Sequence, residues 1–99
     1  MGSRLHKRRL GDVQRQLSQA RESQKVLEEQ VAVWNDALED SRIRALVSET
    51  PLQTHEYDDL SRHVKAAVTE LERRSSEVRE LTEARDELLR DWKPKDENG

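Results

Sequence analysis

Two long runs of apolar residues, spaced alternately three and four apart, dominate this sequence. The first run begins at Leu10 and ends at Ala45, and nine of its eleven positions are apolar. The second begins at Tyr57 and ends at Trp92, again with nine apolar positions of eleven. Such spacing, sustained over several heptads, predicts coiled-coil helices whose apolar side chains form a narrow seam.

The composition agrees with helices that bury little surface. Only 32% of the 99 residues are apolar and 39% are charged, whereas a compact globule has about 45–50% apolar residues. Such a chain is either disordered or built from long helices, and only the helices predict a strict period. The absence of cysteine excludes disulfides and thiolate zinc sites. No apolar run approaches the roughly 20 residues that span a membrane.

One well-marked break separates the two runs. Pro51 cannot continue a helix, and Thr50 before it suits an N-cap with proline at the first helical position. Gln53 would complete a capping box, while Thr54 is a rival N-cap. We therefore predict one domain with a helix over about 5–47, a turn over about 48–54, a helix over about 55–92 and a frayed tail over 93–99.

A short connection makes consecutive helices antiparallel, so we predict an all-α, antiparallel two-helix coiled-coil hairpin. A register that aligns the polar interruptions Gln24 and Arg74 also places Leu27 near Leu71, and such a polar layer specifies alignment at a cost in stability. Dimerisation into a four-helix bundle stays open. Off-seam valines are either scattered surface hydrophobes or a second contact face, and small scaffolds often gain stability by association.

The tip, where the two helices join, is predicted to bind a partner. Residues 48–72 carry a net charge of −4, whereas residues 1–20 carry +4. The apolar residues near the tip depart from the phase of the seam, so they are expected to turn away from it. The predicted partner-binding residues, with two off-seam valines included, are Ile43, Leu46, Val47, Glu49, Leu52, Tyr57, Asp58, Asp59, Val26 and Val33.

The basic end comprises Arg4, Lys7, Arg8 and Arg9. These side chains could touch phosphate or an anionic membrane surface, and a solvated helix end is the alternative. Because the whole chain is acidic and lacks interleaved aromatic residues, nucleic acid is not the expected partner.

No catalytic site is predicted, because a two-helix rod has no enclosed cavity in which reactive groups converge. We therefore expect no enzyme activity, cofactor or small-molecule substrate. His55, Asp59 and His63 share one helical stripe, but the first and third lie about 12 Å apart along the axis, too far to hold one zinc ion. A solvated helix face is expected there, and a metal-dependent activity at His55 and Asp59 is the rival.

The stretch from Leu38 to Leu52, LEDSRIRALVSETPL, resembles short helical coiled-coil proteins of high-GC Gram-positive bacteria. Thirteen Arg against five Lys agree with a GC-rich genome, but the resemblance implies no activity. The hairpin with an acidic tip is also similar to the coiled-coil arm of Gre-type transcription factors, which enters the secondary channel of RNA polymerase.

These observations together predict a non-enzymatic module that binds another protein or a second copy of itself. The alternative is a transcription-associated regulator that binds RNA polymerase or nucleic acid through its acidic tip and basic end. The basic amino terminus is not followed by an apolar segment, so no signal peptide is predicted and a cytoplasmic location is expected.

Overall fold

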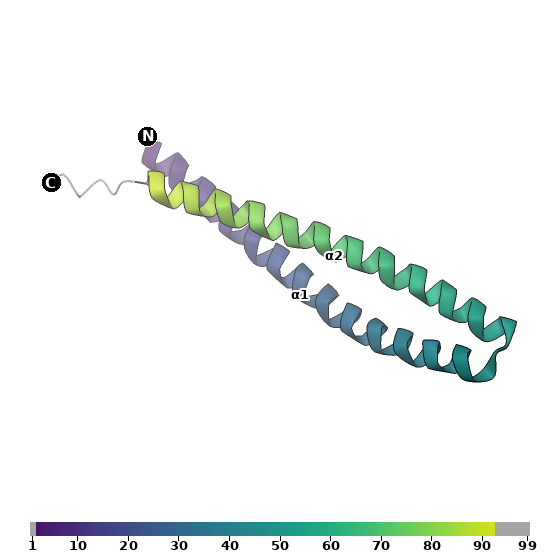
Figure 1. Cartoon of the computed structure of the whole chain (residues 1–99). Coiled ribbons are helices and arrows are strands. Elements are labelled where there is room, and N and C mark those ends of the chain that lie inside the picture. Colours follow the sequence, from purple (N-terminus) through teal and green to yellow (C-terminus); the bar gives the residue numbers. More distant parts are fainter. Residues whose placement is uncertain (1, 93–99) are drawn as a thin grey trace. The chain divides into compact units, whose positions relative to one another are not determined.

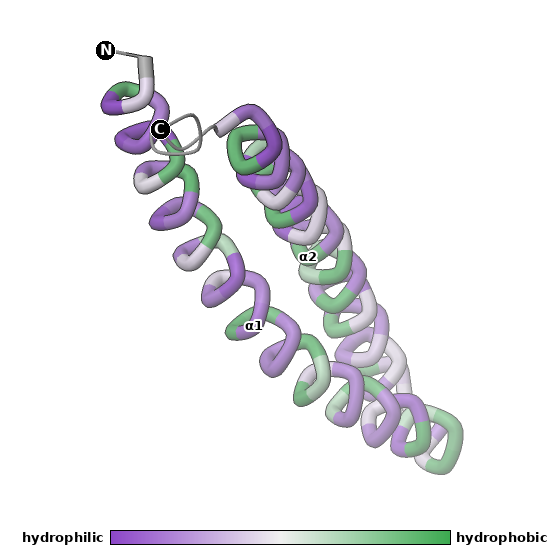
Figure 2. The backbone as a smooth tube through the Cα atoms, turned by 90° about the vertical axis from the view of Figure 1, so that its left-hand side faces the viewer, coloured by the Kyte–Doolittle hydropathy of each residue, from purple (hydrophilic) through white to green (hydrophobic). Residues whose placement is uncertain are grey.

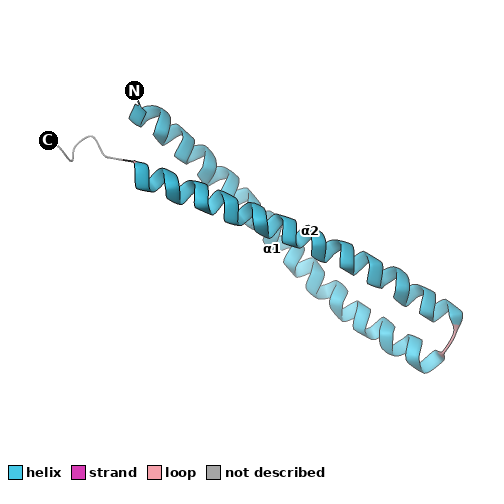
Figure 3. Cartoon of the chain, turned by 45° about the horizontal axis from the view of Figure 1, so that its top comes forward, coloured by secondary structure: helices cyan, strands magenta, loops and turns pink. Residues whose placement is uncertain are grey.

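The computed structural model describes residues 2–92, which form two helices joined by two residues. Helix α1 spans Gly2–Ser48 and helix α2 spans Pro51–Asp91 (Figure 1). The described residues contain no strand, and a single short loop joins the helices (Figure 3). The predicted all-α helical hairpin is therefore confirmed. The tail predicted over 93–99 lies outside the described residues.

The turn is shorter than predicted, because α2 begins at Pro51 rather than at about residue 55. The Thr54 N–H donates to the Thr50 carbonyl oxygen at 3.1 Å, and the Gln53 N–H donates to Thr50 Oγ1 at 3.3 Å. Thr50 is thus the N-cap, and Pro51 occupies the first helical position, where its missing N–H is not needed. Helix α1 also begins earlier than predicted, at Gly2 rather than at about residue 5.

The connection depends on an unusual backbone conformation at Glu49, whose φ is 50°. The Glu49 N–H donates to the Ala45 carbonyl at 3.2 Å, which closes the last turn of α1. A residue with a Cβ is strained in this left-handed region by roughly 1–2 kcal/mol. The capping box is only half formed, because the buried Gln53 Oε1 has no hydrogen-bond partner among residues 2–92.

The packing divides the hairpin into two compact units. Unit 1 comprises Met1–Ser23 and Arg74–Gly99, and unit 2 comprises Gln24–Arg73, which includes the turn. Figure 2 shows hydrophobic positions in green returning at intervals along both helices, with hydrophilic positions in purple between them. The apolar core of each unit is therefore small.

Unit 2 is centred on Leu27, Val31 and Ala67, which are buried together. Trp34 from α1 and Leu71 from α2 pack against this cluster, which contains Leu27. These contacts draw one or two side chains per heptad from each helix, which is the seam that the spacing predicted.

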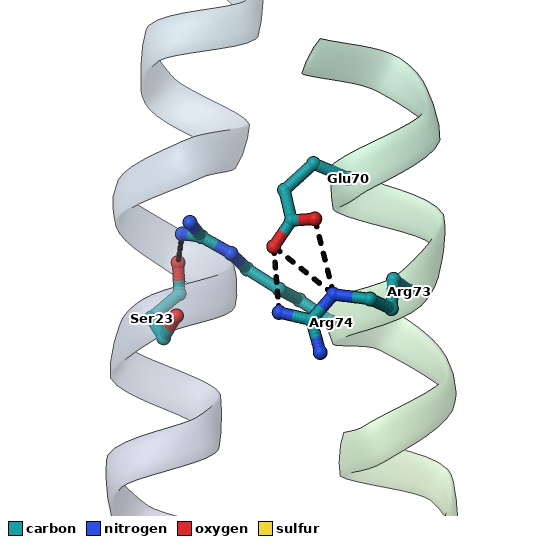
Figure 4. A network of polar contacts seen from close by, with 4 residues as sticks. All are labelled: Ser23, Glu70, Arg73 and Arg74. Carbon is teal, nitrogen blue, oxygen red and sulfur yellow. Dashed lines mark hydrogen bonds and ion pairs between the residues drawn. The ribbon is translucent and has the colours of Figure 1, made fainter. Parts of the chain in front are cut away.

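In unit 1, Leu17 is completely buried and Ala20 nearly so. Arg74, a polar seam position, extends its guanidinium to the other helix and donates from Nη1 to the Ser23 carbonyl oxygen at 3.1 Å (Figure 4). Nearer the chain ends, His6 Nε2 lies 2.6 Å from the Leu88 carbonyl oxygen. Both contacts join α1 to α2 through a side chain and a backbone carbonyl.

A matched pair of valines tests the seam. Val31 is 7% exposed and Val33, on the same helix, is 65% exposed. Val31→Ala should lower the free energy of unfolding by about 2 kcal/mol, since it removes buried carbon and leaves a cavity. Val33→Ala should change it by less than about 0.5 kcal/mol. Urea unfolding followed by circular dichroism measures both, and equal losses would contradict the assigned seam.

Substitutions at Glu49 test the left-handed turn. Because glycine has no Cβ, Glu49→Gly should be more stable than Glu49→Ala by about 1 kcal/mol. In a helix interior the order is reversed, with alanine the more stable by about 0.5–1 kcal/mol. The sign of the difference in thermal unfolding therefore reports the backbone conformation, and a more stable alanine variant would show that the helix continues through residue 49.

Candidate interaction surfaces

Large aliphatic side chains are exposed around the turn of unit 2. Leu46 and Leu52 are each 63% exposed and Val47 is 80% exposed, while Ile43 is about half exposed. Ile43, Leu46 and Val47 fall outside the spacing that carries Leu38 and Ala45 into the seam. No other element of the described chain covers them, so the tip presents apolar surface to solvent.

A shallow, open hollow of about 570 Å³ lies at the tip. It brings together three predicted residues, Leu46, Glu49 and Asp58. Its remaining lining was missed from the sequence, since these residues were assigned to the seam, to a longer turn or, for His55, to a solvated helix face. They are Ala45, Thr50, Pro51, Thr54 and His55. The other predicted tip residues lie outside the lining: Ile43, Val47, Leu52, Tyr57 and Asp59.

The carboxylates of the tip fall into two groups. Asp59 is engaged by Arg62 and by His55, whose Nε2 lies 3.1 Å from Asp59 Oδ2. Glu49 and Asp58 make no ion pair within residues 2–92. Two exposed negative charges at the edge of the hollow are therefore left without a cation from the described chain.

Just before the tip, Arg42 binds Glu39 at 2.6 Å. The hydrogen bond from Arg42, with its charge, holds the pKa of Glu39 below the usual value. The same hydrogen bond raises the pKa of Arg42, with a smaller contribution from Tyr57. A carboxylate whose pKa is lowered by folding stabilises the fold at pH values above its ordinary pKa, and this stabilisation is lost as the pH falls. Because the Glu39–Arg42 pair is exposed and screened by solvent, its contribution to stability is small.

The remaining predicted partner-binding residues lie along the helices. Tyr57 is half-buried at the start of the second seam, and Val26 and Val33 are exposed. The two valines are seven residues apart, so they lie on one face of α1. This face is separate in sequence from the hollow at the tip.

All four residues of the basic end are exposed. Leu5, which lies next to Arg4 in the sequence, is 59% exposed. A second shallow hollow, of about 380 Å³, is lined by Arg9 together with Glu87 and Asp91. Arg9 is thus close to carboxylates of its own unit, whereas Arg4, Lys7 and Arg8 lie outside this hollow.

The side chains of His55, Asp59 and His63, which share one stripe of α2, do not come together at one point. His63 packs edge-on against Trp34, with ring centroids 4.5 Å apart, while His55 pairs with Asp59. Within residues 2–92 no group of three or more His, Asp or Glu side chains is placed to hold a metal ion.

Neither α1 nor α2, over the described residues, carries an apolar stretch long enough to cross a membrane. No protein-family model, curated protein or solved structure matches the chain. The resemblances drawn from the sequence therefore stay predictions.

Proposed function

We propose that this protein is a non-enzymatic interaction module whose tip docks on another protein chain. The observation that carries the proposal is the exposure of Ile43, Leu46, Val47 and Leu52 around a two-residue turn. Removing apolar surface from water contributes about 25 cal/mol per Å². Grouped exposed aliphatic residues therefore favour association, and larger patches of this kind mark interaction sites.

The shape of the tip supports a protein partner. Small-molecule sites are concave and enclose most of their ligand, whereas the hollow beside Leu46 is shallow and open. A protruding side chain of a partner protein fits such a surface. Glu49 and Asp58 at its edge favour a partner that offers positive charge beside apolar carbon.

The alternative, a transcription-associated regulator that binds RNA polymerase or nucleic acid, draws support from the exposed basic end. The net charge of −3 opposes nucleic-acid binding by the chain as a whole. We place the protein in the cytoplasm on the sequence expectation alone. Contacts to phosphate weaken steeply as salt rises, whereas apolar docking does not, so the salt dependence separates the two functions.

Matched leucine substitutions test the tip. Leu46→Asp should weaken partner binding at least tenfold, since burying one leucine contributes about 1.5–3 kcal/mol. Leu89→Asp places the same change on an exposed leucine of unit 1 and should leave binding unchanged. Partners captured from an extract of the source cells by the wild-type protein are purified, and their Kd values for all three proteins are measured by calorimetry.

Circular dichroism should show the same helix content in both variants, because both leucines are exposed. Retention of every partner by Leu46→Asp would contradict the tip as the binding surface. A captured partner whose affinity falls steeply with salt, or capture of nucleic acid alone, would favour the alternative function.

A further inference from the structure

We infer that the tip of one copy of this protein binds the basic end of a second copy. The inference rests on the proposed function and names the partner of the same surface. The contact would join the hollow beside Leu46, Glu49 and Asp58 in one copy to the first turns of α1 in the other.

The two units of the chain carry opposite net charges. Unit 2 has six basic and eleven acidic residues, a net of −5, and unit 1 has twelve basic and ten acidic residues, a net of +2. Unit 2 of one copy and unit 1 of another therefore attract each other, whereas two copies of unit 2 repel.

The tip offers the acidic half of the contact. Glu49 and Asp58 are exposed and have no ion-pair partner within residues 2–92, and both line the hollow. Leu46, 63% exposed, lines the same hollow. Two carboxylates that share a hollow with an exposed leucine suit a partner with the converse pattern, in which cations lie near an exposed aliphatic side chain.

The basic end has that converse pattern. Arg4, Lys7 and Arg8 are three and four residues apart, so they share one face of α1. Leu5 is 59% exposed and lies three residues before Arg8, so the two are neighbours on the helix surface. Arg4, Lys7 and Arg8 are exposed and make no ion pair within residues 2–92, so they are available to a second copy.

Docking would cover exposed leucines from both copies in one contact and give Glu49 and Asp58 the cations that residues 2–92 of their own chain do not supply. Arginine and carboxylate also form paired, charge-assisted hydrogen bonds, which fix orientation. The surfaces are small, so association is expected to be weak and reversible, as in transient complexes.

A charge-swap experiment tests the inference on the full chain by sedimentation velocity over a range of protein concentrations. The tip-reversed variant is Glu49→Lys/Asp58→Lys, and the end-reversed variant is Lys7→Glu/Arg8→Glu. Each variant alone should associate at least tenfold more weakly than the wild type, since like charges then meet. An equimolar mixture of the two should regain association, because opposite charges face each other again at both contacts.

The matched control is Glu29→Lys/Glu72→Lys, which alters net charge as the tip-reversed variant does but at exposed sites away from the turn. It should associate like the wild type. Higher salt, from about 50 mM to about 500 mM, should weaken wild-type association because the ionic contacts are exposed and screened. Unchanged helix content confirms that each variant is folded.

A wild-type protein that stays monomeric at every concentration would overturn the inference. The inference would also be overturned if the tip-reversed variant associated as strongly as the wild type, or if the control variant lost as much association as the tip-reversed variant. Failure of the equimolar mixture to regain association would overturn it as well. If the wild type is monomeric but Leu46→Asp still abolishes binding of another protein, the inference fails while the proposed function stands. If the charge swap succeeds while Leu46→Asp binds every partner normally, the inference stands, but the proposal that exposed aliphatic side chains of the tip bind the partner fails.

Discussion

The narrow antiparallel seam is the constraint on which the rest of this hairpin depends. Over the described residues each helix buries only a few side chains, such as Leu17 and Leu27 of α1 and Val64 and Ala67 of α2. Most remaining positions face water, which is why 39% of the residues can be charged in an ordered chain. The polar seam position Arg74 is accommodated because its guanidinium bonds the Ser23 carbonyl, so a half-buried charge keeps a partner.

The seam also explains why the tip is apolar and exposed. The connection between α1 and α2 is only two residues, and it is made possible by the left-handed backbone at Glu49. Leu46, Val47 and Leu52 flank this connection on the sides away from the seam, so neither helix covers them. Surface that the fold cannot bury is available to a partner, and the nearby Glu49 and Asp58 limit which partners fit.

The fold could be predicted from the sequence because its period is strict, but the length of the turn could not. Thr50 and Thr54 both satisfy the N-cap pattern, and only the bonds to Thr50 decide between them. Nothing in a glutamate at position 49 indicates a left-handed conformation, whereas a glycine would have done so. The longer predicted turn was therefore wrong.

The candidate site was predictable in part. Exposure of Ile43 and Val47 follows from their phase relative to the seam. Which acidic residue pairs with Arg62 could not be predicted, because Arg62 lies four residues after Asp58 and three after Asp59, and both spacings allow an ion pair. The structure pairs Arg62 with Asp59, which leaves Asp58 at the hollow. The hollow itself depends on the geometry of the turn, which no local pattern specifies.

The most direct test of the seam is a disulfide between Leu27→Cys and Leu71→Cys in one chain at low protein concentration. The packing of Leu71 against the cluster that contains Leu27 predicts a bridge within a single chain. The pair Leu27→Cys with Val64→Cys, one heptad away in the same unit, should not form a bridge. Bridges between chains, or faster closure of the shifted pair, would contradict an intramolecular antiparallel seam in this register.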